Sequence, residues 1–125
     1  WMSFAAETLA RFRDVDEIRV APYAEDGFAY DGRLVWVVVV DGRVFIRSWK
    51  GAEAEWFVRS ARSRRARITV HDEPDTGIEV VFQRERDADV QARIDAEYLR
   101  KYPRPYSHEM TLPAAAATTL EVLPA

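Results

Sequence analysis

The feature that most constrains the fold is an unbroken apolar run over residues 34–40, Leu-Val-Trp-Val-Val-Val-Val. Its β-branched valines favour an extended strand, and the lack of a polar face predicts a central strand that is buried on both sides. Asp41 and Gly42 follow, and both residue types tolerate the positive φ that a tight hairpin turn requires. Residues 44–49 then have the pattern of a return strand, so the sequence predicts an antiparallel hairpin inside a sheet.

Four further segments have the alternation or β-branched content of short strands. They are residues 17–22, 67–71, 78–83 and 118–123, and a Pro- and Gly-containing turn at 73–77 joins the middle two. Hairpins and short helices connect successive strands, which favours antiparallel pairing. Six short strands in 125 residues tend to close into a barrel, because closure removes exposed sheet edges.

Three helices are expected around this barrel. The first covers about residues 3–14, with Ser3 as its cap, and the second covers 53–65 with Trp56 and Phe57 on its inner side. The third covers 87–102, where apolar residues recur at helical spacing and the acidic pair Asp87 and Asp89 stands at the start. We expect one domain over residues 1–125, with the barrel over about 15–123.

Composition excludes several kinds of function. The chain has no cysteine, so it forms no disulfide, thiolate metal site, iron–sulfur cluster or cysteine nucleophile. A net charge of -3 argues against a nucleic-acid or membrane-surface partner. The apolar run is far shorter than the roughly 20 residues of a membrane span, and no signal segment opens the chain, so we expect a cytoplasmic protein.

Basic and aromatic residues alternate over residues 47–67 of this acidic chain. The cations are Arg47, Lys50, Arg59, Arg62, Arg64, Arg65 and Arg67, and the aromatic residues between them are Trp49, Trp56 and Phe57. Guanidinium and ammonium groups hold phosphate or carboxylate, and indole faces cover a flat ring. A phosphorylated flavin-type coenzyme meets both requirements. The alternatives are a helix with an ordinary core face and a solvated basic face, or a single-stranded nucleic-acid site.

The remaining residues of catalytic type form no recognised cluster. Neither His71 nor His108 lies in a cluster with other histidines or carboxylates at metal-ligand spacing, so no metal site is predicted. Nucleophile-elbow, phosphate-loop and dinucleotide motifs are absent from the sequence. Tyr102, Tyr106 and His108 are the candidates for orienting a substrate or donating a proton.

Several stretches together resemble a known group of proteins. They are residues 35–51 (VWVVVVDGRVFIRSWKG), 55–61 (EWFVRSA), 66–70 (ARITV), 93–102 and 117–124. Over roughly residues 15–123 the chain resembles the split β-barrel proteins that bind FMN or a deazaflavin coenzyme. It most resembles the DUF2255 family, a group of uncharacterised bacterial proteins. The resemblance implies an α+β, mainly β fold: a six-stranded antiparallel split β-barrel with flanking helices.

The resemblance also implies a cofactor site. Ser48, Lys50 and Gly51 would lie near the coenzyme phosphate, with Trp56 beneath the turn and Arg59 reaching the anion. Arg47 and Trp49 complete the expected set of cofactor-binding residues. The chain departs from the wider pattern because Trp49 separates Ser48 from Lys50, Phe57 replaces a hydroxyl-bearing aromatic residue, and Arg59-Ser60 replaces a more polar pair.

The implied activity is that of a flavin- or deazaflavin-dependent oxidoreductase acting on a small molecule. FMN or a deazaflavin is the expected coenzyme, with haem ranked below them, and a homodimer is the expected assembly. The alternative is a non-catalytic homodimeric binding module with a vestigial cofactor site.

Overall fold

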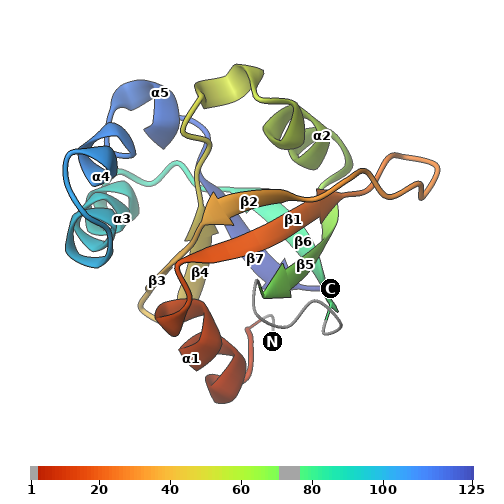
Figure 1. Ribbon diagram of the computed structural model, residues 1–125, viewed down its shortest axis with the longest axis horizontal. Coiled ribbons are helices and arrows are strands. Elements are labelled where there is room, and N and C mark those ends of the chain that lie inside the picture. Colours follow the sequence, from red (N-terminus) through yellow and green to blue (C-terminus); the bar gives the residue numbers. More distant parts are fainter. Residues whose placement is uncertain (1–2, 71–76) are drawn as a thin grey trace.

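A computed structural model of the chain describes residues 3–70 and 77–125. Its strands form one sheet in the order β2-β1-β5-β6-β7-β4-β3, with every neighbouring pair antiparallel. The strands are β1 (Glu17–Pro22), β2 (Arg33–Trp36), β3 (Val38–Val40), β4 (Arg43–Ile46), β5 (Arg65–Val70), β6 (Gly77–Arg84) and β7 (Leu120–Pro124). The sheet curls into a nearly closed barrel with helices around it (Figure 1), which confirms the predicted fold class.

The barrel closes through the apolar run at residues 34–40. Its first half pairs with β1, where Ile18 lies opposite Val35, and its second half pairs with β4, where Val38 lies opposite Phe45. The two halves therefore stand at opposite ends of the strand order although only Val37 separates them. We predicted six strands, and the structure has seven in the part that it describes, because this strand changes its pairing partner midway.

Side chains from the end of the third long helix satisfy the backbone at this break. The Val37 N–H donates to the hydroxyl of Tyr102 at 3.0 Å, and Lys101 Nζ donates to the carbonyls of Val37 at 2.7 Å and Phe12 at 3.0 Å. The Tyr102 hydroxyl also lies 2.7 Å from the carbonyl oxygen of Asp16. Burial raises the pKa of Tyr102, and desolvation lowers the pKa of Lys101 to about 8.

The helices are α1 (Ala6–Asp14), α2 (Glu55–Ser63), α3 (Ala88–Lys101), α4 (Tyr106–Glu109) and α5 (Pro113–Ala116), with a 3-10 turn η1 (Gly51–Glu53). In Figure 1, α2 lies on one side of the barrel, α3 to α5 gather on another, and α1 covers a third. Among the described residues, no helix is long and apolar enough to cross a membrane.

The predicted helices are observed with shifted ends. The first begins at Ala6 after Ala5, with no side-chain cap, so the predicted cap by Ser3 is wrong. The second is shorter than 53–65, because a 3-10 turn precedes it and Arg64 adopts a left-handed φ of 60° that ends it. Asp87 caps α3 as expected, since its Oδ1 accepts hydrogen bonds from the Asp89 and Val90 N–H groups.

Four predicted strands also have shifted ends: β5 begins at Arg65 rather than 67, β6 covers Gly77–Arg84 rather than 78–83, and the ends of β4 and β7 differ most. The return strand ends at Ile46 rather than 49, and β7 begins at Leu120 because Thr119 Oγ1 bonds back to the Ala116 carbonyl at 2.7 Å. Residues 71–76, which include His71 and most of the predicted turn at 73–77, lie outside the described residues.

Burial on both sides is confirmed for residues 37–39 of the apolar run, but it is wrong for the first part, where Leu34 is 39% exposed and Trp36 is half-buried. Val35, Val37 and Val39 belong to the cluster inside the barrel, which Phe12 of α1 and Phe57 of α2 also join. Val38 and Phe45 belong to a second cluster between the sheet and α3, together with Ile94, Tyr98, Tyr102 and Met110. Alternate residues of one strand thus fill two different apolar layers.

Candidate functional site

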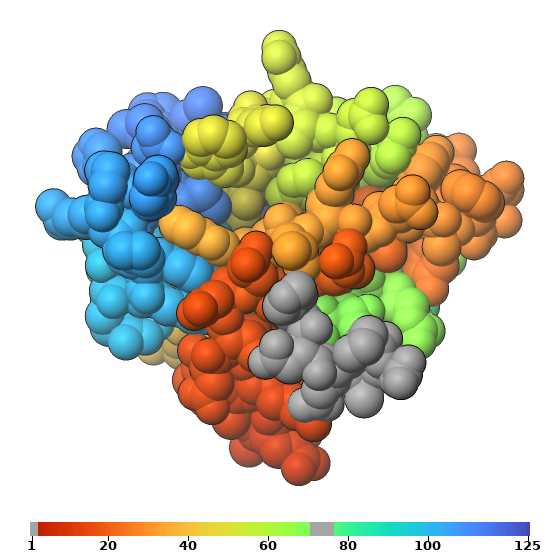
Figure 2. All heavy atoms as spheres, viewed as in Figure 1, coloured from red at the N-terminus to blue at the C-terminus, as the bar shows by residue number. Residues whose placement is uncertain are grey.

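A cleft of about 820 Å³ lies beside the segment that follows β4. Residues of β2, of the turn after β4, of the start of α2 and of α4 line it. Its apolar lining consists of Leu34, Val35, Trp36, Trp49, Ala54, Trp56, Tyr106 and Met110. Figure 2 shows this face, where yellow atoms of the segment after β4 lie near the orange atoms of β2 and the blue atoms of the C-terminal helices. Such a lining suits a flat apolar ligand.

Residues 48–51 form a tight turn at the cleft. The Gly51 N–H donates to the Ser48 carbonyl at 3.0 Å, and Gly51 has a φ of 79°, which favours glycine at this position. The turn places Trp49 and Lys50 at its two central positions, where both are exposed. Of the seven predicted site residues, Arg47, Ser48, Trp49, Lys50 and Trp56 line this one cleft.

Arg47 continues the alternation of β4 and therefore points toward α3, as Phe45 does. It is only 1% exposed. Its Nε donates to Thr119 Oγ1 at 2.9 Å, its Nη1 to Asp95 at 2.5 Å and to the Met110 carbonyl at 2.8 Å, and its Nη2 to Gln91 Oε1 at 2.5 Å. Protein groups thus use the guanidinium donors, so Arg47 holds the start of the turn in place.

Ser48 is the buried polar residue of the turn. Its N–H donates to Thr118 Oγ1 at 2.8 Å, which fixes the backbone. Its own hydroxyl is buried and has no hydrogen-bond partner among the described residues, although buried hydroxyls are normally paired. A polar atom of a ligand in the cleft would give this hydroxyl its hydrogen-bond partner.

Trp49 and Lys50 differ in how they are held. The Trp49 indole is 59% exposed, and its N–H donates to Glu109, which ties the turn to α4. Within the described part of the chain, no ion pair or hydrogen bond engages Lys50 Nζ. Lys50 therefore keeps three donors for a ligand at the cleft.

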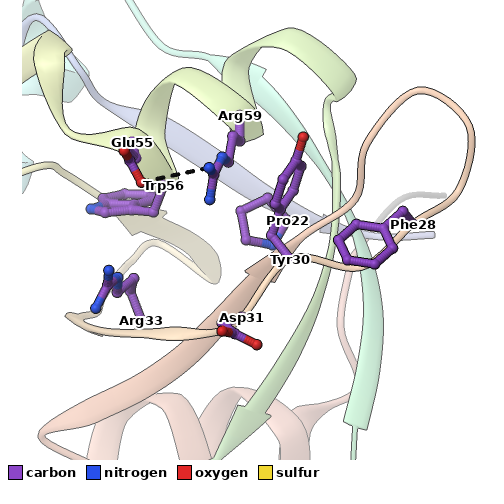
Figure 3. A pocket seen from close by; sticks show the side chains of 8 residues that line it. All are labelled: Pro22, Phe28, Tyr30, Asp31, Arg33, Glu55, Trp56 and Arg59. Atoms are coloured by element: carbon purple, nitrogen blue, oxygen red, sulfur yellow. Dashed lines mark ion pairs between the residues drawn. The ribbon is translucent and has the colours of Figure 1, made fainter.

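Trp56 and Arg59 face a smaller pocket of about 280 Å³ that adjoins the cleft (Figure 3). Arg33, Glu55 and Trp56 line both spaces. Arg59 lies in the smaller pocket and not in the lining of the larger one, so the structure separates it from Lys50. In Figure 3 its side chain projects from α2 between Trp56 and Tyr30.

The basic segment 47–67 does not form one patch. Arg65 lies over the ring of Tyr23 and Arg67 pairs with Glu79 at 3.4 Å, both away from the cleft. The charged groups that line the cleft are Arg33, Arg47 and Lys50 with Glu17, Glu53 and Glu55. The balance of charges suits a ligand with one local anionic group better than a polyanion such as a nucleic acid.

The three candidates for substrate contact have different surroundings. Tyr106 lines the cleft and is exposed, whereas His108 is exposed on α4 and does not line it. The Tyr102 hydroxyl is committed to the break at Val37, and its ring stacks on Trp36 with centroids 4.0 Å apart.

Sequence reasoning missed the contribution of β2. Arg33, Leu34 and Trp36 line the cleft, although the apolar pattern indicated a strand buried on both faces. The available signal was Arg33 itself, a cation placed directly before the apolar run. Met110 was also missed, since the short helix α4 leaves no periodic pattern.

Comparison with solved structures shows the fold. The chain aligns with a candidate pyridoxamine 5'-phosphate oxidase of Listeria innocua at 15% identity and a TM-score of 0.62, covering 95% of this chain and 90% of the other. It aligns with HutZ, the haem storage protein of Vibrio cholerae, at 12% identity and 0.65, covering 98% and 90%. A haem-binding protein of Mycobacterium smegmatis matches at 16% and 0.60, covering 97% of this chain and 51% of that one.

At these identities the likeness extends to the split-barrel architecture alone. None of the curated proteins matches the chain. A family model described as an uncharacterised protein conserved in bacteria, DUF2255, matches residues 8–122, almost the full length. The chain therefore belongs to the DUF2255 family.

Proposed function

We propose that the cleft binds a phosphorylated flavin-type coenzyme, FMN or a deazaflavin, and that the protein uses it as a small-molecule oxidoreductase. The observation that carries the proposal is the turn at residues 48–51. It brings the Lys50 ammonium and the Ser48 hydroxyl, neither of which has a partner among the described residues, to one cleft that Trp36, Trp49 and Trp56 also line.

The residues present fit such a coenzyme. Lys50 and Ser48 would hold the phosphate by charge-assisted hydrogen bonds, and Gly51 gives the turn its shape. Trp49 and Trp56 offer faces for a flat ring system. The cleft volume of about 820 Å³ lies within the usual range for small-molecule sites. Arg47 would position the turn without contacting the ligand.

The relatives of known fold support two ligand chemistries, a phosphorylated aromatic ring and haem. Haem in proteins is commonly held by histidine. Among the described residues, His108 does not line the cleft, whereas Ser48 and Lys50 do, which supports the phosphorylated coenzyme.

A bound flavin supplies the electron transfer, and the protein supplies position and surroundings. The tryptophan side chains would orient the ring and exclude water from its face. Tyr106 is the hydroxyl-bearing side chain at the cleft that could orient a substrate, since Tyr102 is committed to the barrel. Leu34, Trp49 and Tyr106 are large, exposed and gathered at this cleft, which favours a second copy of the chain covering it.

Titration of the purified protein with FMN, a deazaflavin and haemin tests the proposal, with riboflavin as the ligand that lacks the phosphate. We expect FMN or the deazaflavin to bind saturably, and FMN to bind at least tenfold more tightly than riboflavin. Lys50→Ala removes one charge-assisted contact worth about 1.5–3 kcal/mol, so it should weaken FMN binding at least tenfold.

Arg62→Ala is the matched control, because Arg62 is an exposed cation on α2 that lines neither space. It should leave the affinity for FMN unchanged. If no coenzyme binds, the alternative of a non-catalytic module replaces the redox proposal. Equal affinity of Lys50→Ala and the unaltered protein would remove the turn as the phosphate site. Light scattering would test the homodimer.

A further inference from the structure

The smaller pocket has the make-up of a separate binding site. It holds about 280 Å³, and the side chains of Pro22, Phe28, Tyr30, Asp31, Arg33, Glu55, Trp56 and Arg59 line it. The β1–β2 connection and β2 provide one wall, and α2 provides the other (Figure 3). Arg33, Glu55 and Trp56 are common to this pocket and the cleft, so a molecule here would lie next to one in the cleft.

Two guanidinium groups face this pocket with donors to spare. The Arg59 guanidinium lies over the Tyr30 ring, with Cζ 3.9 Å from the ring centroid, and this cation–π contact forms no hydrogen bond with the N–H groups. Its ion pair with Glu55 is long, at 3.5 Å between Nη2 and Oε2. Arg33 is exposed and, among the described residues, has no ion pair. In Figure 3 both side chains point toward Trp56.

We propose that this pocket binds the carboxylate of a small planar molecule, aromatic or conjugated, with Arg33 and Arg59 on the carboxylate and Tyr30 and Trp56 on the planar body. A guanidinium matches a carboxylate through two parallel hydrogen bonds, which a lysine does not. That this molecule is the redox substrate rests on the proposed function. It would then lie next to the coenzyme, with Trp56 between the two molecules.

Charge and size favour a carboxylate over a phosphate here. Asp31 and Glu55 balance the two arginines, so the lining has no net formal charge. The two carboxylates repel a dianionic phosphate more strongly than a monoanion, and a monoanion with an apolar body meets its partners on Arg33, on Arg59 and on the aromatic walls. The volume of about 280 Å³ is near the lower limit for ligand sites and suits a single ring rather than a coenzyme.

Benzoate is the probe, and benzamide is its neutral control of the same shape. The ¹⁵N-labelled protein is titrated without coenzyme, and the indole N–H signal of Trp56 is assigned from Trp56→Phe. We expect benzoate to shift this signal saturably and to bind at least fivefold more tightly than benzamide. Arg59→Gln and Arg33→Gln should each weaken benzoate at least fivefold, while Arg59→Lys weakens it less than Arg59→Gln.

Arg62→Gln on the same helix should leave benzoate affinity unchanged. Equal binding of benzoate and benzamide, or full affinity in both arginine variants, overturns the carboxylate assignment. Inorganic phosphate competing better than benzoate also overturns it. Lys50→Ala should leave benzoate binding intact. In the unaltered protein, benzoate binding without any FMN binding counts against the proposed coenzyme site alone, and FMN binding without any benzoate binding counts against this inference alone.

Discussion

Two sets of cationic and phenolic side chains in this protein have opposite surroundings. The first, the buried polar contacts of α3, consists of Arg47 and Tyr102, which are buried, and Lys101, which is half-buried. Each of them hydrogen-bonds to protein groups of the barrel or of α3 to α5. The second, the cleft cations, consists of Arg33, Lys50 and Arg59, which keep free donors next to Trp56 or the turn at 48–51.

The difference shows that residue type and sequence position alone do not reveal whether a cationic side chain stabilises the fold or is available to bind a ligand. Arg47 and Lys50 are three positions apart in one predicted site. Arg47 is buried and its donors bond to protein groups, whereas Lys50 is exposed and has no partner in the part of the chain that the structure describes. A buried charge is costly unless its donors are satisfied, so Arg47 serves the fold. An unpaired cation at a cleft contributes little to stability and remains available for binding.

The largest expected effect is that of Arg47→Met, which keeps the volume but removes every donor. The Gln91 and Thr119 side chains and the Met110 carbonyl lose a buried partner, and Asp95 loses its ion pair. We expect the free energy of unfolding to fall by about 3 kcal/mol, measured by urea denaturation.

Arg93→Met on α3, the helix that Arg47 contacts, is the control for that experiment. Arg93 forms an exposed ion pair with Asp41, so its loss should cost less than about 1 kcal/mol. Equal destabilisation by the two substitutions would show that Arg47 does not anchor the turn.

Tyr102→Phe should have the next largest effect. The substitution keeps the stack on Trp36 but leaves the buried N–H of Val37 without its acceptor. A buried donor left unpaired costs about 1–3 kcal/mol, and we expect a loss of about 2 kcal/mol of unfolding free energy. Tyr106→Phe, at an exposed site, should cost less than about 0.5 kcal/mol. A similar small effect of Tyr102→Phe would mean that the break at Val37 needs no support from α3.

Local patterns account for what the sequence predicted well. The hairpin at Asp41 and Gly42, and the cap by Asp87, depend on residues within a few positions of each other. The break at Val37 depends on Tyr102, 65 positions away, so no local pattern reveals it. The same holds for the candidate site, where the resemblance implied that Ser48, Lys50 and Gly51 lie together with Arg59, but tertiary packing separates Arg59 from them.

The pH dependence of stability gives a smaller effect at Lys101. Desolvation lowers its pKa to about 8 from an ordinary value of 10.5, so between these values the unfolded chain holds more protons than the folded chain. The free energy of unfolding should therefore rise from pH 8 to pH 10, by about 1 kcal/mol because solvent still reaches part of the side chain. Urea denaturation at pH 7, 8.5 and 9.5 measures it, and Lys101→Met should remove the rise.

Above pH 10 the sign reverses. Burial raises the pKa of Tyr98 and of Tyr102, so the unfolded chain loses their protons first and stability should fall. A stability curve that is flat from pH 7 to pH 9.5 in the unaltered protein would show that Lys101 is as well solvated in the folded chain as in the unfolded one.

Lys50→Ala should have the smallest effect on stability and a large effect on binding. Since Lys50 has no partner within the described residues, its removal should change the free energy of unfolding by less than about 0.5 kcal/mol. Comparing the loss of unfolding free energy in Lys50→Ala with that in Arg47→Met, three positions earlier, then tests whether Arg47 stabilises the fold while Lys50 serves ligand binding. A loss above about 1 kcal/mol in Lys50→Ala would place Lys50 with the buried polar contacts of α3, and would weaken its assignment as the phosphate-binding group.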